Sequence, residues 1–174
     1  MMFFCARLIA TLGGCGFIPI APGTMASALT CLILYLLYQM IPLSDGSLII
    51  WCVGGAILMS ALLGYYATYV YINQTQSHDP KEVVIDEFLG QSFAVFIFLI
   101  YQPYSDTDSI TLIDWMILFL SFRFFDITKI WPASHFDRHA HSAFSVMADD
   151  VIAGIYAGLT SLAVSYFLRG IDVF

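Results

Sequence analysis

Residues 48–72 form a continuous segment without a single Asp, Glu, Lys or Arg. A helix needs about 17–25 apolar residues to cross the hydrocarbon core of a bilayer, and within that core the chain must pair its own backbone N–H and C=O groups. An α-helix meets both requirements. The segment therefore predicts a membrane-spanning helix, and the rest of the chain has to fold beside it.

Four further segments are apolar in the same way: 28–41, 88–101, 110–125 and 151–168. The last is long enough to span a bilayer, and the other three are marginal. The chain is 60% hydrophobic and 11% charged, whereas soluble domains are about 25% charged. We therefore expect an all-α, polytopic helical membrane protein with about five apolar helices, folded as a single domain over residues 1–174.

Charge and cysteine content exclude several other classes of protein. A net charge of -7 with only six Lys and Arg residues argues against a nucleic-acid partner, because binding phosphate backbones requires many cations. The four cysteines lack C-x-x-C pairing, so we expect small buried hydrophobic side chains and no disulfide framework or zinc site. The first residues lack a basic region, so we do not expect a cleaved signal peptide.

The basic residues predict how the chain threads through the membrane. With five spans, one face of the membrane receives five of the six: Arg7, Lys81, Arg123, Lys129 and Arg138. The opposite face receives only Arg169. Because short cytoplasmic loops carry an excess of Lys and Arg, we expect the N-terminus inside and the C-terminus outside. The segments with chemically interesting residues then all lie on the cytoplasmic face.

Two acidic doublets, Asp86–Glu87 and Asp149–Asp150, stand directly before apolar segments. One interpretation is helix capping, because acids in a first turn satisfy free N–H groups and oppose the helix dipole. The other interpretation is a shared site. Gly90 and Gly154 follow Asp86 and Asp150 at the i,i+4 spacing, where a glycine allows a neighbouring helix to approach closely.

If the doublets meet, up to five carboxylates share one pocket: Asp86, Glu87, Asp126, Asp149 and Asp150. Like charges in a low-dielectric pocket repel, so they either take up protons or bind a cation. Ligands that are all oxygen atoms favour a hard ion, above all Mg²⁺. These five acids are therefore our candidate metal ligands.

Cations stand close to these acids in the sequence. Arg123, Asp126 and Lys129 are spaced by three, which predicts one shared helical face ending at Trp131-Pro132. The face can be an interfacial salt-bridge ladder with Trp131 as a membrane anchor, or a phosphate clamp beside a metal-binding acid. Both interpretations are open at this point.

The segment "GGCGFIPIAPGTMASA", residues 13–28, is dense in Gly and Pro and then changes to helix-forming residues. We expect Thr24 or Ser27 to cap the helix that follows, and free N–H groups at a helix start suit a phosphate. The alternative is a turn that only re-enters the membrane. The G-x-x-x-x-G-K-[ST] pattern of a Walker loop is absent.

Four segments in order resemble the phosphatidylglycerophosphatase A family of bacterial inner-membrane, Mg²⁺-dependent lipid phosphatases. They are "PIAPGTMAS" at 19–27, "DPKEVVIDEFLG" at 79–90, "FRFFDITKIWP" at 122–132 and "FDRHAHSAFSVMADDVIAG" at 136–154. The resemblance covers roughly residues 13–155. It implies hydrolysis of phosphatidylglycerophosphate to phosphatidylglycerol and phosphate.

The resemblance also implies which residues form the site. The catalytic candidates are the five acids named above. The substrate-binding candidates are Pro22, Gly23, Thr24, Ser27, Arg123, Lys129 and Arg138. The chain departs from the family pattern at Ala26, Ile130, Ser142, Ala143 and Ser145. The last three replace glycines and so remove backbone freedom from what we expect to be a loop before Asp149.

Within this interpretation the reaction is attack by water on a phosphomonoester, assisted by a metal and by one carboxylate as base. A covalent aspartyl-phosphate is an open alternative. A small membrane transporter is the rival class, because acids within the membrane also mark ion pathways; it predicts acids in mid-span, where only Asp114 stands. A non-catalytic membrane assembly subunit is the third possibility.

Overall fold

A computed structural model describes residues 2–41, 46–77, 80–101, 110–138 and 142–171, with only the backbone described at 46, 136–138 and 170–171. The described residues form helices and no strand, as predicted. The elements are α1 Met2–Ala10, the 3-10 helix η1 Leu12–Phe17, α2 Pro22–Met40, α3 Gly46–Thr75, α4 Ile85–Tyr101, α5 Leu112–Thr128, α6 Ala133–Arg138 and α7 Ala143–Ile171.

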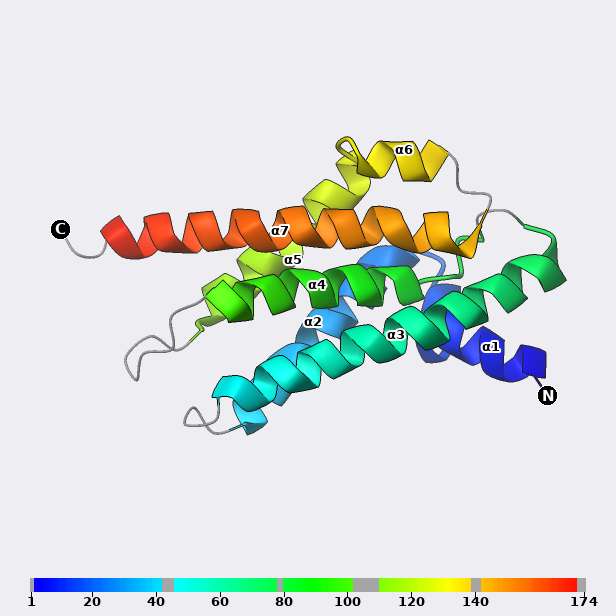
Figure 1. Cartoon of the computed structure of the whole chain (residues 1–174), viewed down its shortest axis with the longest axis horizontal. Helices are drawn as coiled ribbons and strands as arrows, with labels where there is room; N and C mark the ends of the chain where they lie inside the picture. The colour runs from blue at the N-terminus through cyan, green and yellow to red at the C-terminus, as the bar shows by residue number, and fades with distance from the viewer. Residues whose placement is uncertain (1, 42–45, 78–79, 102–109, 139–141, 172–174) are drawn as a thin grey trace.

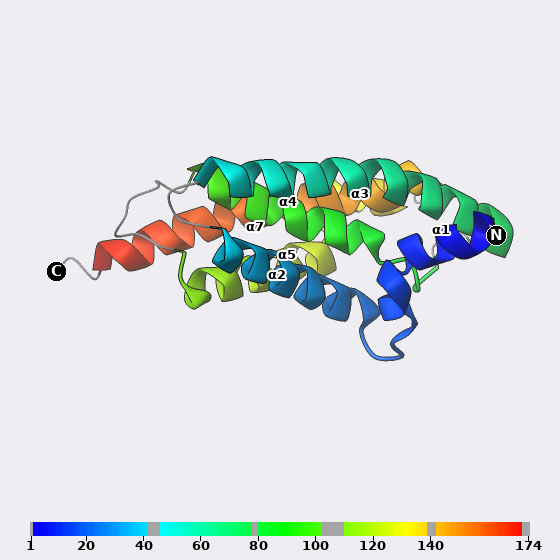
Figure 2. The same ribbon diagram turned by 90° about the horizontal axis from the view of Figure 1, so that it is seen from below.

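Each of the five predicted apolar segments corresponds to one long helix and extends beyond it by two residues at most. These helices run along the molecule in alternating directions: α2, α4 and α7 start at the end that carries α1, and α3 and α5 start at the other end (Figures 1 and 2). The starts of α2, α4 and α7 and the end of α5 therefore come together. Short connections between antiparallel neighbours produce this arrangement.

Three of the described helices are long and apolar enough to cross a membrane: Pro22–Met40, Ser47–Thr75 and Ala143–Arg169. The helices α4 and α5 have 17 residues each. At 1.5 Å per residue they are about 25 Å long, slightly less than the hydrocarbon core of about 30 Å. The protein is thus a helical membrane protein, and helix length alone supports three spans of the expected five.

Tight packing of α4 against α7 forms the centre of the bundle. A Cβ atom added to Gly90 would lie 2.5 Å from the carbonyl oxygen of Asp150, and one added to Gly154 would overlap the carbonyl oxygen of Gly90. Only glycine permits this distance between the two backbones. The predicted approach of the two helices at Gly90 and Gly154 is confirmed, and it brings the two acidic doublets together.

Asp114 lies at the opposite end of the bundle and not in the middle of a helix. It is the third residue of α5 and forms a capping box with Thr111. Its Oδ1 accepts a hydrogen bond of 2.6 Å from Ser165, and its Oδ2 accepts one of 3.0 Å from Arg169. Asp114 as a whole is only 3% exposed, and the bonds of its carboxylate join the start of α5 to the end of α7.

Two features of the fold differ from expectation. The short helices α1 and α6 have no counterpart among the predicted segments; α1 is held by packing of Ala6 and Ala10 in one apolar cluster with Ala67 of α3. Of the four cysteines, all free, only Cys31 is buried, and Cys5 is exposed. The prediction of buried cysteines is therefore wrong for Cys5, whose helix α1 presents it to the outside.

Candidate active site

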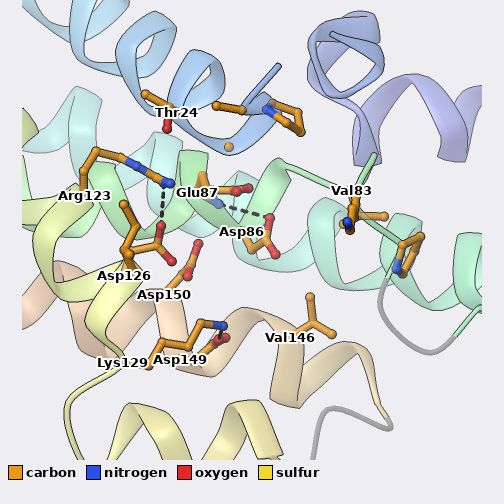
Figure 3. A pocket seen from close by; sticks show the side chains of 16 residues that line it. Thr24, Val83, Asp86, Glu87, Arg123, Asp126, Lys129, Val146, Asp149 and Asp150 are labelled. Atoms are coloured by element: carbon orange, nitrogen blue, oxygen red, sulfur yellow. Dashed lines mark hydrogen bonds and ion pairs between the residues drawn. The ribbon is translucent and has the colours of Figure 1, made fainter. Parts of the chain in front are cut away.

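A cavity of about 440 Å³ lies where α2, α4, α5 and α7 meet (Figure 3). All five acids singled out in the sequence line it, together with three cations. The charged lining residues are Asp86, Glu87, Asp126, Asp149, Asp150, Lys81, Arg123 and Lys129. Eight of the sixteen lining residues are charged, in a chain of which only 11% is charged.

Three of the acids form a compact group. Ligand oxygens of Asp86, Glu87 and Asp150 all lie within 4.8 Å of one another, and Figure 3 shows these side chains directed toward a common point. Asp150 is only 4% exposed, and Oε2 of Glu87 is buried without a hydrogen-bond partner among the described residues. Three clustered carboxylates with an unsatisfied buried oxygen fit a hard divalent cation such as Mg²⁺.

The other two acids are ion-paired. Oδ2 of Asp126 lies 2.5 Å from Nη1 of Arg123, which precedes it by one turn on α5. Oδ2 of Asp149 lies 2.7 Å from Nζ of Lys129. These pairs compensate two of the five negative charges and leave the three-acid group as the place where repulsion is greatest. The cavity therefore separates into an acidic group and a flanking set of cations.

The capping interpretation applies to only one doublet. Asp86 and Glu87 are in the first turn of α4, and Oδ1 of Asp86 accepts a 3.1 Å hydrogen bond from the Glu87 N–H. Asp149 and Asp150 are in the second turn of α7, which starts at Ala143. Because the free N–H groups of a helix are confined to its first turn, the second doublet does not cap α7.

The start of α7 also corrects the expectation of a loop before Asp149. Residues 143–145 are helical, and Ser142 accepts a 3.2 Å hydrogen bond from the N–H of Ser145. Ser142 thus occupies the position of a helix-capping residue. No glycine is required here, because helical backbone suits any of these side chains. The serine instead stabilises the helix that carries Asp149 and Asp150.

Lys129 does not share a helical face with Arg123 and Asp126. Helix α5 ends at Thr128, and Lys129 has the left-handed conformation (φ 45°) while its N–H donates to the Phe125 carbonyl. Left-handed residues commonly end helices, and a proline three residues later prevents continuation. The predicted single face is wrong for this residue, and the turn directs Lys129 across the cavity to Asp149.

The start of α2 differs from the predicted cap. The residue before the helix is Ala21, with φ 48°, and no side chain caps the helix. Ser27 lies in the second turn, where its hydroxyl donates to the Gly23 carbonyl and accepts a 3.2 Å bond from Arg123. The capping prediction is therefore wrong for both Thr24 and Ser27, because Pro22 starts the helix before either residue.

The first turn of α2 nevertheless forms one wall of the cavity through Pro22, Gly23 and Thr24. A Cβ on Gly23 would overlap Oε1 of Glu87, so glycine allows this turn to lie directly against the acid. The N–H groups of a first helical turn have no partners within the helix and carry a partial positive charge. Ser27, by contrast, does not line the cavity. Its hydroxyl accepts a hydrogen bond from Arg123, which does line it.

Sequence reasoning missed Lys81 and Ile127, which also line the cavity. The sequence signal for Lys81 was its position five residues before Asp86; for Ile127 it was adjacency to Asp126. Arg138 is the last residue of α6, and the structure describes its backbone but not its side chain. Its predicted contact with substrate therefore stays a prediction.

Known proteins are similar in sequence to this chain over most of its length. The family model described as phosphatidylglycerophosphatase A matches residues 8–165. Phosphatidylglycerophosphatase A of Escherichia coli is 30% identical over 163 residues, which cover 93% of this chain and 82% of that protein. Phosphatidylglycerophosphatase A of Haemophilus influenzae is 32% identical over 162 residues, covering 93% and 90%.

A third relative, from Bacteroides thetaiotaomicron, has the provisional name phosphatidylinositol-3-phosphatase and is 31% identical over 159 residues, covering 88% of this chain and 89% of that protein. No solved structure matches this chain. The matched residues include every residue that lines the cavity, from Ala21 to Asp150. The chain belongs to the phosphatidylglycerophosphatase A family.

Proposed function

We propose that this protein hydrolyses phosphatidylglycerophosphate to phosphatidylglycerol and inorganic phosphate, a step in the synthesis of anionic phospholipids. One observation carries the proposal: in a chain of this family, a cavity at the ends of membrane helices combines a three-carboxylate group with flanking cations. Cations and helix N–H groups suit a phosphate, and carboxylates suit a divalent ion.

Mg²⁺ is the proposed cofactor, held by Asp86, Glu87 and Asp150, with Asp126 and Asp149 as further candidate ligands if their ion pairs open. When bound, Mg²⁺ neutralises charge on phosphoryl oxygens and polarises the phosphorus toward attack. The buried Glu87 Oε2 has no hydrogen-bond partner in the part of the chain that the structure describes. This supports the assignment, because a buried carboxylate oxygen is normally satisfied.

The protein's own residues perform the remaining tasks. Arg123 and Lys129, each already oriented by an acid, bind the phosphate oxygens, and Lys81 adds a third positive charge at the cavity. The first turn of α2 contributes N–H groups on the other side. One of the cavity carboxylates removes the proton from the attacking water. A carboxylate attacking phosphorus directly, to form an aspartyl-phosphate, is the alternative chemistry.

We propose five membrane crossings in a bacterial inner membrane, with the active site facing the cytoplasm. The alternating directions of α2, α3, α4, α5 and α7 support this topology (Figure 1). Arg7, Lys81, Arg123 and Lys129 belong to the end with the cavity, whereas Arg169 is in the last turn of α7. This asymmetry favours a cytoplasmic cavity. A slight thinning of the bilayer accommodates the shorter α4 and α5.

A second candidate substrate is phosphatidylinositol 3-phosphate, favoured by the name of the Bacteroides relative. Both lipids carry a phosphomonoester on a headgroup, so the same cavity chemistry serves either. The three relatives are equally similar, at 30–32% identity, and similarity alone does not separate the substrates. A transporter is disfavoured, because Asp114, its one mid-span candidate, is bonded within a helix cap.

The test is phosphate release by the purified protein in mixed micelles. Phosphatidylglycerophosphate, phosphatidylinositol 3-phosphate and water-soluble glycerol phosphate are compared, each with Mg²⁺ and with a chelator. We expect phosphatidylglycerophosphate to be cleaved fastest, only with Mg²⁺, and far faster than glycerol phosphate. Faster cleavage of the inositol lipid would transfer the assignment to that substrate, and absence of phosphate release from every lipid would contradict a phosphatase.

A further inference from the structure

The acidic cavity has one apolar edge that reaches the outside of the bundle. Among the larger apolar side chains that line it, Val83 and Val146 are buried, at 5% and 7% exposure, whereas Ile127 on α5 is 69% exposed. Ile127 therefore belongs both to the cavity and to the outer surface of the protein. An apolar residue at the mouth of a charged cavity suits a molecule that is itself part charged and part apolar.

Ile127 continues into an apolar stripe along α5. Leu120 and Met116 precede it by 7 and 11 residues, which is close to two and three helical turns, so all three share one face. Leu120 is 59% exposed and Met116 is 57% exposed. We call these three residues the α5 stripe. At 1.5 Å per residue it is about 16 Å long, close to half of a hydrocarbon core of about 30 Å.

Two contacts between helices beside the cavity are too close to admit a lipid chain. The backbones of α4 and α7 touch at Gly90 and Gly154, beside Asp150. On the other side, Arg123 bonds to Ser27 and so joins α5 to α2. At these two contacts the described helices leave no room for an acyl chain. A lipid with its phosphate among the acids therefore keeps its chains on the outer surface.

A separate apolar groove of about 530 Å³ lies between α3, α4 and α7, and Leu58, Phe93 and Val151 are among its lining residues. It shares no lining residue with the acidic cavity. The α4–α7 contact stands between the two. The groove is thus less suited than the α5 stripe to a lipid whose phosphate is in the cavity, and it supplies a matched control.

We propose that the α5 stripe is the acyl-chain subsite of the lipid substrate, with Ile127 at the junction between the stripe and the phosphate cavity. This inference rests on the proposed function. The lipid reaches the cavity sideways from the bilayer, its chain lying along Met116 and Leu120 within one leaflet. Contact with the stripe orients the headgroup ester toward the acids, and a phosphate ester without acyl chains gains nothing from it.

The test uses Ile127→Asn, Leu120→Asn and the control Leu58→Asn, which changes a leucine of the groove that is also 59% exposed. Steady-state kinetics are measured on phosphatidylglycerophosphate and on glycerol phosphate. We expect kcat/KM on the lipid to fall about 10-fold in both stripe variants, mainly through KM, as for loss of an apolar substrate contact. Activity of Leu120→Asn on glycerol phosphate and all activities of Leu58→Asn should match those of the wild type.

Melting temperature and gel filtration in detergent identify any variant that misfolds, and Ile127→Leu, which retains the apolar edge, should behave like the wild type. Wild-type kcat/KM on the lipid in Leu120→Asn and Ile127→Asn would overturn the subsite, as would equal losses on both substrates in Leu120→Asn. A loss of kcat/KM on the lipid in Leu58→Asn alone would instead assign the acyl chain of the lipid to the groove between α3, α4 and α7. If the wild-type protein itself releases no phosphate from the lipid, the proposed function fails first.

Discussion

The backbone of Gly90 on α4 lies against the backbone of Asp150 on α7, so closely that a Cβ at Gly90 would come within 2.5 Å of the Asp150 carbonyl oxygen. One turn before Gly90, Asp86 points to the same cavity as Asp150. The contact between the backbones of Gly90 and Asp150 therefore determines the distance between the two acidic doublets.

Adding a methyl group at this contact should separate the helices. For Gly90→Ala and Gly154→Ala we expect losses of about 1–3 kcal/mol in stability, as for overpacking, and a loss of activity larger than the stability change explains. Melting temperature and phosphate release in detergent provide the measurement. Gly55→Ala is the control, because nothing lies within 4 Å of a Cβ there. Wild-type activity in Gly154→Ala would contradict the role of this contact.

Substitution of Asp114, at the end of the bundle opposite the cavity, should lower stability and leave catalysis unchanged. Asp114→Asn removes the charge that accepts bonds from Arg169 and Ser165 and weakens the cap of α5. We expect a loss of about 1–3 kcal/mol in stability, seen as a lower melting temperature, with kcat on the lipid near the wild-type value at a temperature where the variant is folded. A selective loss of kcat would instead implicate Asp114 in the reaction.

The support of Arg123 by Ser27 gives a graded prediction. Ser27→Ala removes the hydroxyl's bond to the Gly23 carbonyl of its own helix and its bond to Arg123. The bond to Arg123 is worth about 1 kcal/mol, so we expect kcat/KM to fall about five-fold. Arg123→Lys keeps the charge but cannot reproduce both contacts of the guanidinium, and it should lose more. The control is Ser60→Ala, since that hydroxyl bonds only to the Ile57 carbonyl of its own helix in the described residues. An effect of Ser60→Ala equal to that of Ser27→Ala would refute the prediction.

The approach of the two doublets could be predicted from sequence because it depends on local spacing. Asp86 with Gly90, and Asp150 with Gly154, each stand four residues apart on one helix face, and a shared glycine face indicates close packing. The five apolar segments were predictable for the same reason, since uninterrupted hydrophobicity over a helix-length segment has few other structural solutions in a membrane.

Other parts of the site depend on where helices end, which sequence specifies less well. Thr24 and Ser27 are good capping residues, but Pro22 starts α2 first. Lys129 matched a helical spacing, but a left-handed turn directs it to Asp149. The role of Asp114 required knowledge of which distant segment lies beside it, because Ser165 and Arg169 are more than fifty residues away in the sequence.

We propose that Asp86 and Asp150 act in catalysis and not merely in helix formation. The variants Asp86→Asn and Asp150→Asn preserve size and remove charge at the three-acid group. The control Glu82→Gln removes a charge from a residue that precedes Asp86 by four positions and does not line the cavity. Each protein is purified in detergent and examined for phosphate release from phosphatidylglycerophosphate and for the change in melting temperature on adding Mg²⁺.

We expect both aspartate variants to lose at least about 100-fold in rate while remaining folded, because removing one of several repelling charges does not destabilise the group. Mg²⁺ should raise the melting temperature of the wild-type protein and of Glu82→Gln, since a ligand that binds the native state stabilises it, and should have little effect on the two aspartate variants. Retained activity and an unchanged Mg²⁺ response in Asp150→Asn would contradict the account.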